Sequence, residues 1–213
     1  MTIKSLKNIT NKFMNKKIVL IRHCKASMEG KDEERALDQD GVVQANSLCE
    51  KLSKILKPDS VIFTSPFTRA IDSLVPLTKI NHKVKINKVK FLEEIHIAKN
   101  HDLTKHQIIE KMWSDPSFSV EGGISQLDHY NSIKSELENM FENFKKENKD
   151  IIIVTHGNLL GMIIKFLFKL DFKFDDWKIM SMPDLYLMNF DENNNVINLK
   201  RDIENIEKIF QIK

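Results

Sequence analysis

Short apolar runs alternate along the chain with longer segments in which apolar positions recur every third or fourth residue. The runs at residues 18–21, 61–63 and 151–154 are short and mostly β-branched, which is typical of strands buried on both faces of a sheet. A further short strand is expected at 85–88. Helices are expected at 3–14, from 40 until Pro58, from Pro66 through Leu74, and at 104–113, 127–147 and 159–170.

Strands that alternate with helices imply a mainly parallel sheet with helices on both faces. We therefore predict an α/β fold, a three-layer αβα sandwich, in a single domain that spans residues 1–213. The segment 92–126 is less regular and is interpreted as a small cap insertion. Near the C-terminus, residues 185–190 and 196–199 flank a turn-rich string and predict a hairpin.

Two local signals carry further expectations. Ser65 followed by Pro66 is a typical helix start, with a capping side chain and then proline at the first helical position. In the segment 202–213 the apolar residues are at helical spacing, which favours packing on the core or on a partner.

Composition excludes several classes of protein. Hydrophobic residues make up 41% of 213 residues, which is enough for a core, and the net charge of +3 does not suggest a nucleic-acid partner. No stretch approaches the ~20 apolar residues that a membrane helix needs. Cys24 and Cys49 make no disulfide framework, so a cytoplasmic location is expected. No pattern points to a particular oligomeric state.

Charge is uneven at the N-terminus. Residues 1–28 contain lysines and one arginine but no acidic residue before Glu29. Such a segment most often forms a solvent-exposed basic surface. The alternative is a positive approach to an anionic substrate.

Reactive side chains follow the predicted strands. His23 and His156 come directly after the runs at 18–21 and 151–154, and sites in parallel sheets lie at the carboxyl ends of strands. Arg22 precedes His23, and Arg69 lies in the first turn expected after the strand at 61–63. An imidazole can attack phosphorus, and guanidinium groups bind phosphoryl oxygens. Each residue alone is more often structural, but the combination favours a phosphate site.

Five segments of the chain contain these residues or lie between them. They are Ile21-Arg22-His23-Cys24-Lys25-Ala26, Arg35-Ala36-Leu37-Asp38-Gln39-Asp40-Gly41, Thr64-Ser65-Pro66-Phe67-Thr68-Arg69-Ala70, Leu92-Glu93-Glu94-Ile95 and Val154-Thr155-His156-Gly157. In this order they resemble the motifs of the histidine phosphatase (phosphoglycerate mutase-like) superfamily. The resemblance covers residues 18 to about 165.

The resemblance implies roles for five residues. His23 would be the nucleophile that becomes phosphorylated, and Arg22, Arg69 and His156 would bind the phosphoryl group. Glu94 would protonate the leaving oxygen and then activate water. Glu93 is the competing candidate for that acid, although the Leu-x-Glu spacing favours Glu94. The reaction implied is hydrolysis of a phosphorylated small molecule, without a metal or other cofactor.

Several positions depart from the family pattern. They are Cys24 in place of glycine, Ala26 in place of serine or threonine, Glu29 in place of asparagine, Asp38 in place of threonine, Ala98 in place of glycine, and Gly123-Ile124-Ser125 without the usual glutamate. These changes bear on the substrate and leave the five site residues intact.

Other activities stay open or are disfavoured. A protein phosphohistidine phosphatase is an alternative, because a short branch of the superfamily shares the Arg-His-x-Lys-Ala start and a later Arg-x-Leu. A phosphate-binding pseudophosphatase without turnover is another, whereas mutase activity is less favoured. A cysteine phosphatase needs Arg six residues after Cys24, where Gly30 stands. The spacing of His96, His101 and His106 does not suit a metal site.

Overall fold

The computed structural model describes residues 17–57, 59–81, 84–99, 102–147, 149–191, 193, 195–203 and 206–210. The helix expected at 3–14, Pro58 and His101 lie outside these residues.

A seven-stranded sheet, counted over the described residues, forms the centre of the fold. Its order is β3-β2-β4-β1-β5-β6-β7. The strands are β1 Lys17–Arg22, β2 Val61–Thr64, β3 Ile86–Lys88, β4 Ile151–Thr155, β5 Asp184–Phe190, β6 Val196–Ile203 and β7 Ile206–Phe210. The first four strands in this order pair in parallel, and the last three are added in antiparallel fashion. The predicted strands and the β5–β6 hairpin are confirmed.

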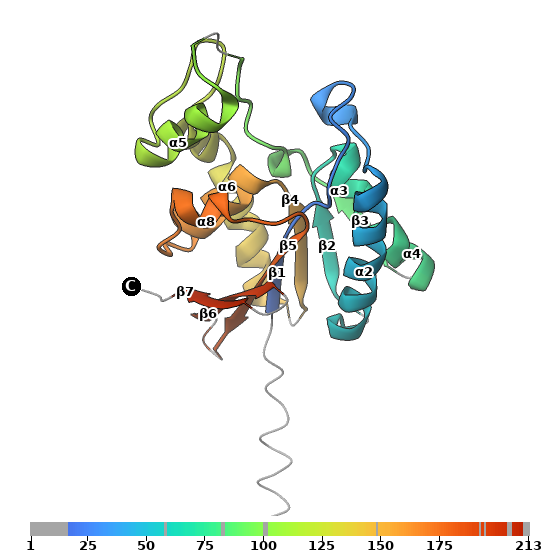
Figure 1. Cartoon of the computed structure of the whole chain (residues 1–213). Helices are drawn as coiled ribbons and strands as arrows, with labels where there is room; N and C mark the ends of the chain where they lie inside the picture. The colour runs from blue at the N-terminus through green and yellow to red at the C-terminus, as the bar shows by residue number, and fades with distance from the viewer. Residues whose placement is uncertain are drawn as a thin grey trace, which may run out of the picture.

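Helices cover both faces of the sheet (Figure 1). They are α2 Gln39–Ile55, α3 Thr68–Asp72, α4 Val75–Ile80, α5 Lys105–Ser114, α6 Gln126–Lys146, α7 Gly157–Met162 and α8 Phe174–Lys178. Two short 3-10 helices, η1 Asp32–Glu34 and η2 Lys90–Leu92, and a π-helix, η3 Ile163–Leu167, complete the set. In Figure 1, α2, α3 and α4 lie on one side of the sheet and α5, α6 and α8 on the other. The predicted three-layer αβα sandwich is confirmed.

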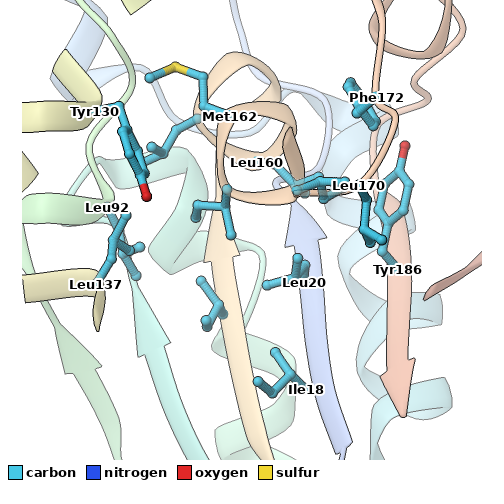
Figure 2. Packing of buried hydrophobic residues seen from close by; sticks show 14 of the residues in the cluster. Ile18, Leu20, Leu92, Tyr130, Leu137, Leu160, Met162, Leu170, Phe172 and Tyr186 are labelled. Atoms are coloured by element: carbon cyan, nitrogen blue, oxygen red, sulfur yellow. The ribbon is translucent and has the colours of Figure 1, made fainter. Parts of the chain in front are cut away.

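Side chains along the central strands point alternately to the two faces of the sheet, and each face has its own hydrophobic core. Val19 and Ile21 of β1 pack in the cluster beneath α2, α3 and α4, whereas Ile18 and Leu20 pack in the cluster on the opposite face. Because successive strand residues point to opposite faces, an uninterrupted apolar run fills both clusters. Figure 2 shows the second cluster, where Leu20 lies below Leu160 of α7 and Ile18 lies farther down β1.

The helix expected from Pro66 through Leu74 is wrong in its details. The helix α3 begins at Thr68, its N-cap is Phe67, and no side chain caps it. Ser65 does not cap the helix because its hydroxyl accepts a hydrogen bond from Phe67 N at 3.2 Å and contacts His156. The helix also ends at Asp72, and α4 starts separately at Val75.

Two other helical expectations need correction. The helix predicted at 159–170 begins at Gly157 and changes to π geometry from Ile163 to Leu167. The helical spacing in 202–213 is misleading, since residues 206–210 form strand β7 beside β6. Strand pairing along the exposed edge of β6 has overridden the local pattern.

The segment 92–126 carries α5 and long connections. Thr104 and Gln107 form a capping box at the start of α5. The buried face of α5, which includes Ile108, Met112 and Trp113, joins the core cluster beside β1 and β4. Within the described residues, no helix is both long enough and apolar enough to cross a membrane.

Candidate active site

The side chains predicted to carry the chemistry meet at one edge of the sheet. Strands β2, β4 and β1 are neighbours and run in parallel, so their carboxyl ends lie side by side. His23 follows β1, His156 follows β4, and Arg69 lies just beyond β2. The rings of His23 and His156 are 5.0 Å apart between centroids. The topology therefore brings together residues that are far apart in the sequence.

The hydrogen bonds of His23 define its tautomer. Its Nδ1 lies 2.7 Å from the carbonyl oxygen of Cys24, which can only accept, so Nδ1 carries the hydrogen. Its Nε2 lies 3.1 Å from Nε of Arg69, which can only donate, so Nε2 is unprotonated. The ring therefore presents a lone pair at Nε2, as a nucleophilic imidazole must.

The environment of His23 keeps it neutral. The side chain is only 7% exposed. Burial is the largest cause that lowers the pKa of His23 to about 3; the positive charges of Arg69, Arg22 and Arg35 act in the same direction, and the hydrogen bond to Cys24 O opposes them. At neutral pH the unprotonated form is consequently the stable one.

Arg69 reaches His23 from the start of α3. Its side chain is 3% exposed, and its guanidinium carbon lies 4.9 Å from the centre of the Phe67 ring. While its Nε–H is directed at His23, its other two nitrogens donate to Asp32, one to the backbone oxygen and one to the carboxylate at 3.2 Å. All three nitrogens are thus engaged by other groups of the protein.

His156 is fully buried at the start of α7. Its Nε2 lies 2.7 Å from the hydroxyl of Ser65, and its Nδ1 has no hydrogen-bond partner among the described residues. Burial, followed by the charges of His23 and Arg69, lowers the pKa of His156 well below its usual range. Because Ser65 occupies Nε2, Nδ1 is the ring atom open to a ligand.

Arg22 is anchored through one end of its guanidinium group. One terminal nitrogen donates to Met180 O at 3.0 Å, whereas the buried Nε has no partner among the described residues. A Cβ atom at position 157 would lie 3.2 Å from that Nε and 3.3 Å from Nε1 of Trp177. Gly157 therefore permits the close approach of Arg22 to the first turn of α7.

Glu94 lies beside the same turn. Its carboxylate accepts hydrogen bonds from the backbone N–H groups of Asn158 and Leu159, both at 3.2 Å. A third bond, from Ile95 N at 3.0 Å, holds the same carboxylate. The acidic candidate favoured by the motif spacing is thus fixed next to His156.

A pocket of about 500 Å³ opens beside Glu94. Its polar lining residues come from two regions of the chain. Lys90, Glu93 and His96 lie close to Glu94 in the sequence, and His129, Ser132 and Glu136 belong to α6. A second groove of about 420 Å³ lies between α6 and strands β2 and β4, and none of the five predicted site residues lines it. Of the five predicted site residues, Glu94 alone lines the pocket beside it.

Cys24, the main departure from the family motif, points away from this site. Its side chain is fully buried in the core beneath α2, and its backbone N–H donates to Ser73 Oγ at 2.9 Å. Burial raises the pKa of its thiol to about 11, so the thiol is protonated at neutral pH. A nucleophilic role for Cys24 has no support in this geometry.

Two of the described histidines outside the predicted site have different surroundings. His106 on α5 packs against the rings of Phe174 and Trp177 of α8. His96 is exposed at the mouth of the pocket. Among the residues that the structure describes, no group of three His, Cys, Asp or Glu side chains is arranged to hold a metal ion.

Three side chains at the site were not predicted to belong to it. Ser65 was interpreted as a helix cap and Arg35 as part of a motif, and Asp32 was given no role. Ser65 contacts His156, and Asp32 contacts both Arg69 and Arg35. Their positions in the sequence could have indicated a place at the site. Ser65 follows a predicted strand, and Asp32 and Arg35 lie within 12 residues of His23.

Three of the solved structures with a similar fold share only 17–20% of their sequence with this chain. The native structure of mycobacterial glucosyl-3-phosphoglycerate phosphatase is 17% identical, with a TM-score of 0.68 over 90% of this chain and 99% of that one. Phosphoserine phosphatase from Entamoeba histolytica, in complex with 3-phosphoglyceric acid, is 17% identical, with a TM-score of 0.68 over 89% and 98%. YhfR of Bacillus stearothermophilus is 20% identical, with a TM-score of 0.65 over 85% and 94%. At these identities the likeness shows a shared fold.

Comparison with family models identifies the family of the chain, beyond its fold. A search of curated proteins finds no match. The family model of the histidine phosphatase superfamily (branch 1), however, matches residues 18–203, which span both histidines and every strand from β1 to β6. The chain belongs to branch 1 of the histidine phosphatase superfamily.

Proposed function

We propose that the protein hydrolyses phosphomonoesters in two steps through a phosphohistidine formed on His23. The observation that carries the proposal is the unprotonated Nε2 of His23, held beside the guanidinium group of Arg69. A neutral imidazole with a directed lone pair is a competent nucleophile, and an adjacent guanidinium group suits the phosphoryl group that it attacks.

In the first step, Nε2 of His23 attacks phosphorus and the bond from phosphorus to the ester oxygen breaks. Arg22, Arg69 and His156 bind the phosphoryl oxygens, whose negative charge they stabilise from largely buried positions. Two buried atoms without a partner among the described residues are available for this contact, the guanidinium Nε of Arg22 and the ring Nδ1 of His156. The hydrogen bond from Nδ1 of His23 to Cys24 O stabilises the positive charge that the ring acquires.

Glu94 is proposed as the proton donor to the leaving oxygen. In the second step its carboxylate takes a proton from water, the water oxygen attacks phosphorus, and the bond to Nε2 of His23 breaks to release phosphate. The position of Glu94 at the pocket, bonded to the backbone of Asn158 in the turn that follows His156, supports this assignment. Glu93 lines the same pocket and is the natural control.

The substrate is proposed to be a small phosphorylated metabolite. The pocket beside Glu94 has room for one, and the segment 92–126, which we take as a cap within a single domain, lies next to it. Similar structures named for glucosyl-3-phosphoglycerate and phosphoserine support a substrate of this size. The protein phosphohistidine alternative requires an open site that admits another protein.

The test is hydrolysis of p-nitrophenyl phosphate from about pH 4 to 8 in the presence of a chelator. Wild type should be active and His23→Ala should lose all measurable turnover. His106→Ala, which changes a histidine outside the site, serves as the matched control and should keep activity. If wild type is inactive but binds vanadate, the protein is a pseudophosphatase and the proposal is wrong.

A further inference from the structure

An internal carboxylate occupies the cationic site next to the candidate nucleophile. Asp32, on η1, contacts Arg69 through its carboxylate at 3.2 Å and through its backbone oxygen. The other oxygen of the same carboxylate pairs with a terminal nitrogen of Arg35. One acidic side chain thus bridges two guanidinium groups.

We propose that Asp32 holds the place of the substrate phosphoryl group in the free enzyme, and that Arg35 is a further phosphate-binding residue uncovered when Asp32 is displaced. The inference rests on the proposed function, because it concerns the same phosphate site. Its physical basis is that a carboxylate and a phosphoryl group present similar pairs of oxygens to a guanidinium fork.

Exposure shows which partner can move. The side chains of Arg69 and Arg35 are 3% and 16% exposed, whereas the side chain of Asp32 is 51% exposed. The two cations are therefore held by their surroundings, and the carboxylate can turn into solvent. Burial disfavours the charge on Asp32, but Arg69 and Arg35 outweigh it and hold the pKa of that carboxyl group below its usual range.

The contact also fixes the position of Arg69. Because Asp32 binds both terminal nitrogens, the remaining Nε–H is directed onto Nε2 of His23, where it covers the lone pair. A phosphoryl group cannot approach Nε2 until this donor turns away. Release of Asp32 would free Arg69 to bind the incoming oxygens and would expose the nucleophile in the same movement.

Arg35 has the location that this role requires. Its positive charge contributes to lowering the pKa of His23, His156 and Arg69. Its Nε is buried without a partner among the described residues. One terminal nitrogen of Arg35 donates to Ser27 O at 3.4 Å, and the other contacts Asp32. Once Asp32 leaves, this second nitrogen is free for a phosphoryl oxygen beside Arg69. A doubly charged phosphate can then replace the single charge of the carboxylate.

The test is calorimetric binding of inorganic phosphate and of orthovanadate to the full chain. Asp32→Asn should tighten both dissociation constants by about three- to tenfold, as expected for loss of a partly exposed competing ion pair. Glu33→Gln removes the same charge from an exposed position on η1 and should leave them unchanged. Arg35→Gln should weaken binding by about tenfold or more, with Arg35→Lys between.

The outcomes separate the two proposals. Weaker or unchanged phosphate binding in Asp32→Asn would overturn the inference and make Asp32 a residue that positions Arg69, even if wild type hydrolyses p-nitrophenyl phosphate. Tighter binding in Asp32→Asn without turnover by wild type would support the inference and overturn hydrolysis. If neither wild type nor Asp32→Asn binds either anion, both proposals fail. Thermal unfolding of Arg35→Gln shows whether its weakened binding reflects a folded protein.

Discussion

Arg69 donates its Nε–H to Nε2 of His23 across 3.1 Å, although the two residues are 46 positions apart in the sequence. The bond pairs a buried cation with a buried neutral imidazole. It determines both the tautomer of His23 and the atom through which we propose that His23 attacks phosphorus. The following predictions depend on this pair and its surroundings.

Replacement of Cys24 by serine should leave most of the activity intact. The thiol lies in the core and is protonated at neutral pH, so the reaction does not use it. We expect kcat of Cys24→Ser on p-nitrophenyl phosphate to stay within about threefold of wild type, because the buried hydroxyl would keep the hydrogen bond that the thiol makes to Ser73. A loss comparable to that of His23→Ala would contradict the histidine mechanism.

Glu94→Gln should affect poor leaving groups more than good ones. An alkoxide needs a proton as it departs, whereas nitrophenolate does not, and general acid catalysis contributes about 10²–10⁴-fold. Hydrolysis rates of an alkyl phosphate and of p-nitrophenyl phosphate should therefore diverge in Glu94→Gln. Glu93→Gln, which changes the neighbouring carboxylate in the same pocket, should slow both esters equally or not at all. Equal slowing of the two esters in Glu94→Gln argues against its role as the acid.

Stability should fall as the pH drops below the usual pKa of histidine. The pKa of His23 is lowered to about 3 in the folded state, so the unfolded chain binds more protons below pH 6.5 and folding loses free energy there. The His23 contribution lost between pH 7 and 4.5 is about 2–3 kcal/mol. Urea unfolding at these two pH values should show a smaller difference for His23→Gln. An identical difference in both proteins would mean that His23 can be protonated without cost.

The buried pair of Asp184 and Arg201 should be important for stability. Arg201 donates to both carboxylate oxygens of Asp184, at 3.0 and 2.7 Å, and each side chain is at most 2% exposed. Loss of one partner leaves an uncompensated buried charge, which costs about 3–5 kcal/mol. Arg201→Met should therefore be strongly destabilised in urea unfolding. Asp184→Asn/Arg201→Met, which removes both charges, should recover part of the loss.

The sequence could predict most of the layers and the general position of the site. Uninterrupted β-branched runs at β1 and β4 identify central strands, because few other elements need apolar residues on both faces. A histidine directly after each of these strands then lies at the same edge of the sheet. This reasoning needs only local pattern and parallel topology.

Other features depend on contacts that local patterns do not record. The position of Ser65 and Pro66 is typical of a helix start, but the hydroxyl of Ser65 is instead engaged by His156, which is 91 residues away. Residues 206–210 have a helical pattern, yet pairing with β6 makes them a strand. Asp32 looks like an ordinary residue of a charged loop until the fold brings Arg69 beside it.

The most direct test of the central claim is detection of the phosphoenzyme. Wild type should be mixed with p-nitrophenyl phosphate, quenched within the first turnovers, and examined by intact mass and peptide mapping under alkaline conditions that preserve phosphohistidine. We predict one added phosphoryl group on His23, absent from His23→Ala and increased in Glu94→Gln if water activation becomes rate-limiting. A phosphoryl group on another residue, or turnover by His23→Ala at the wild-type rate, would contradict the account.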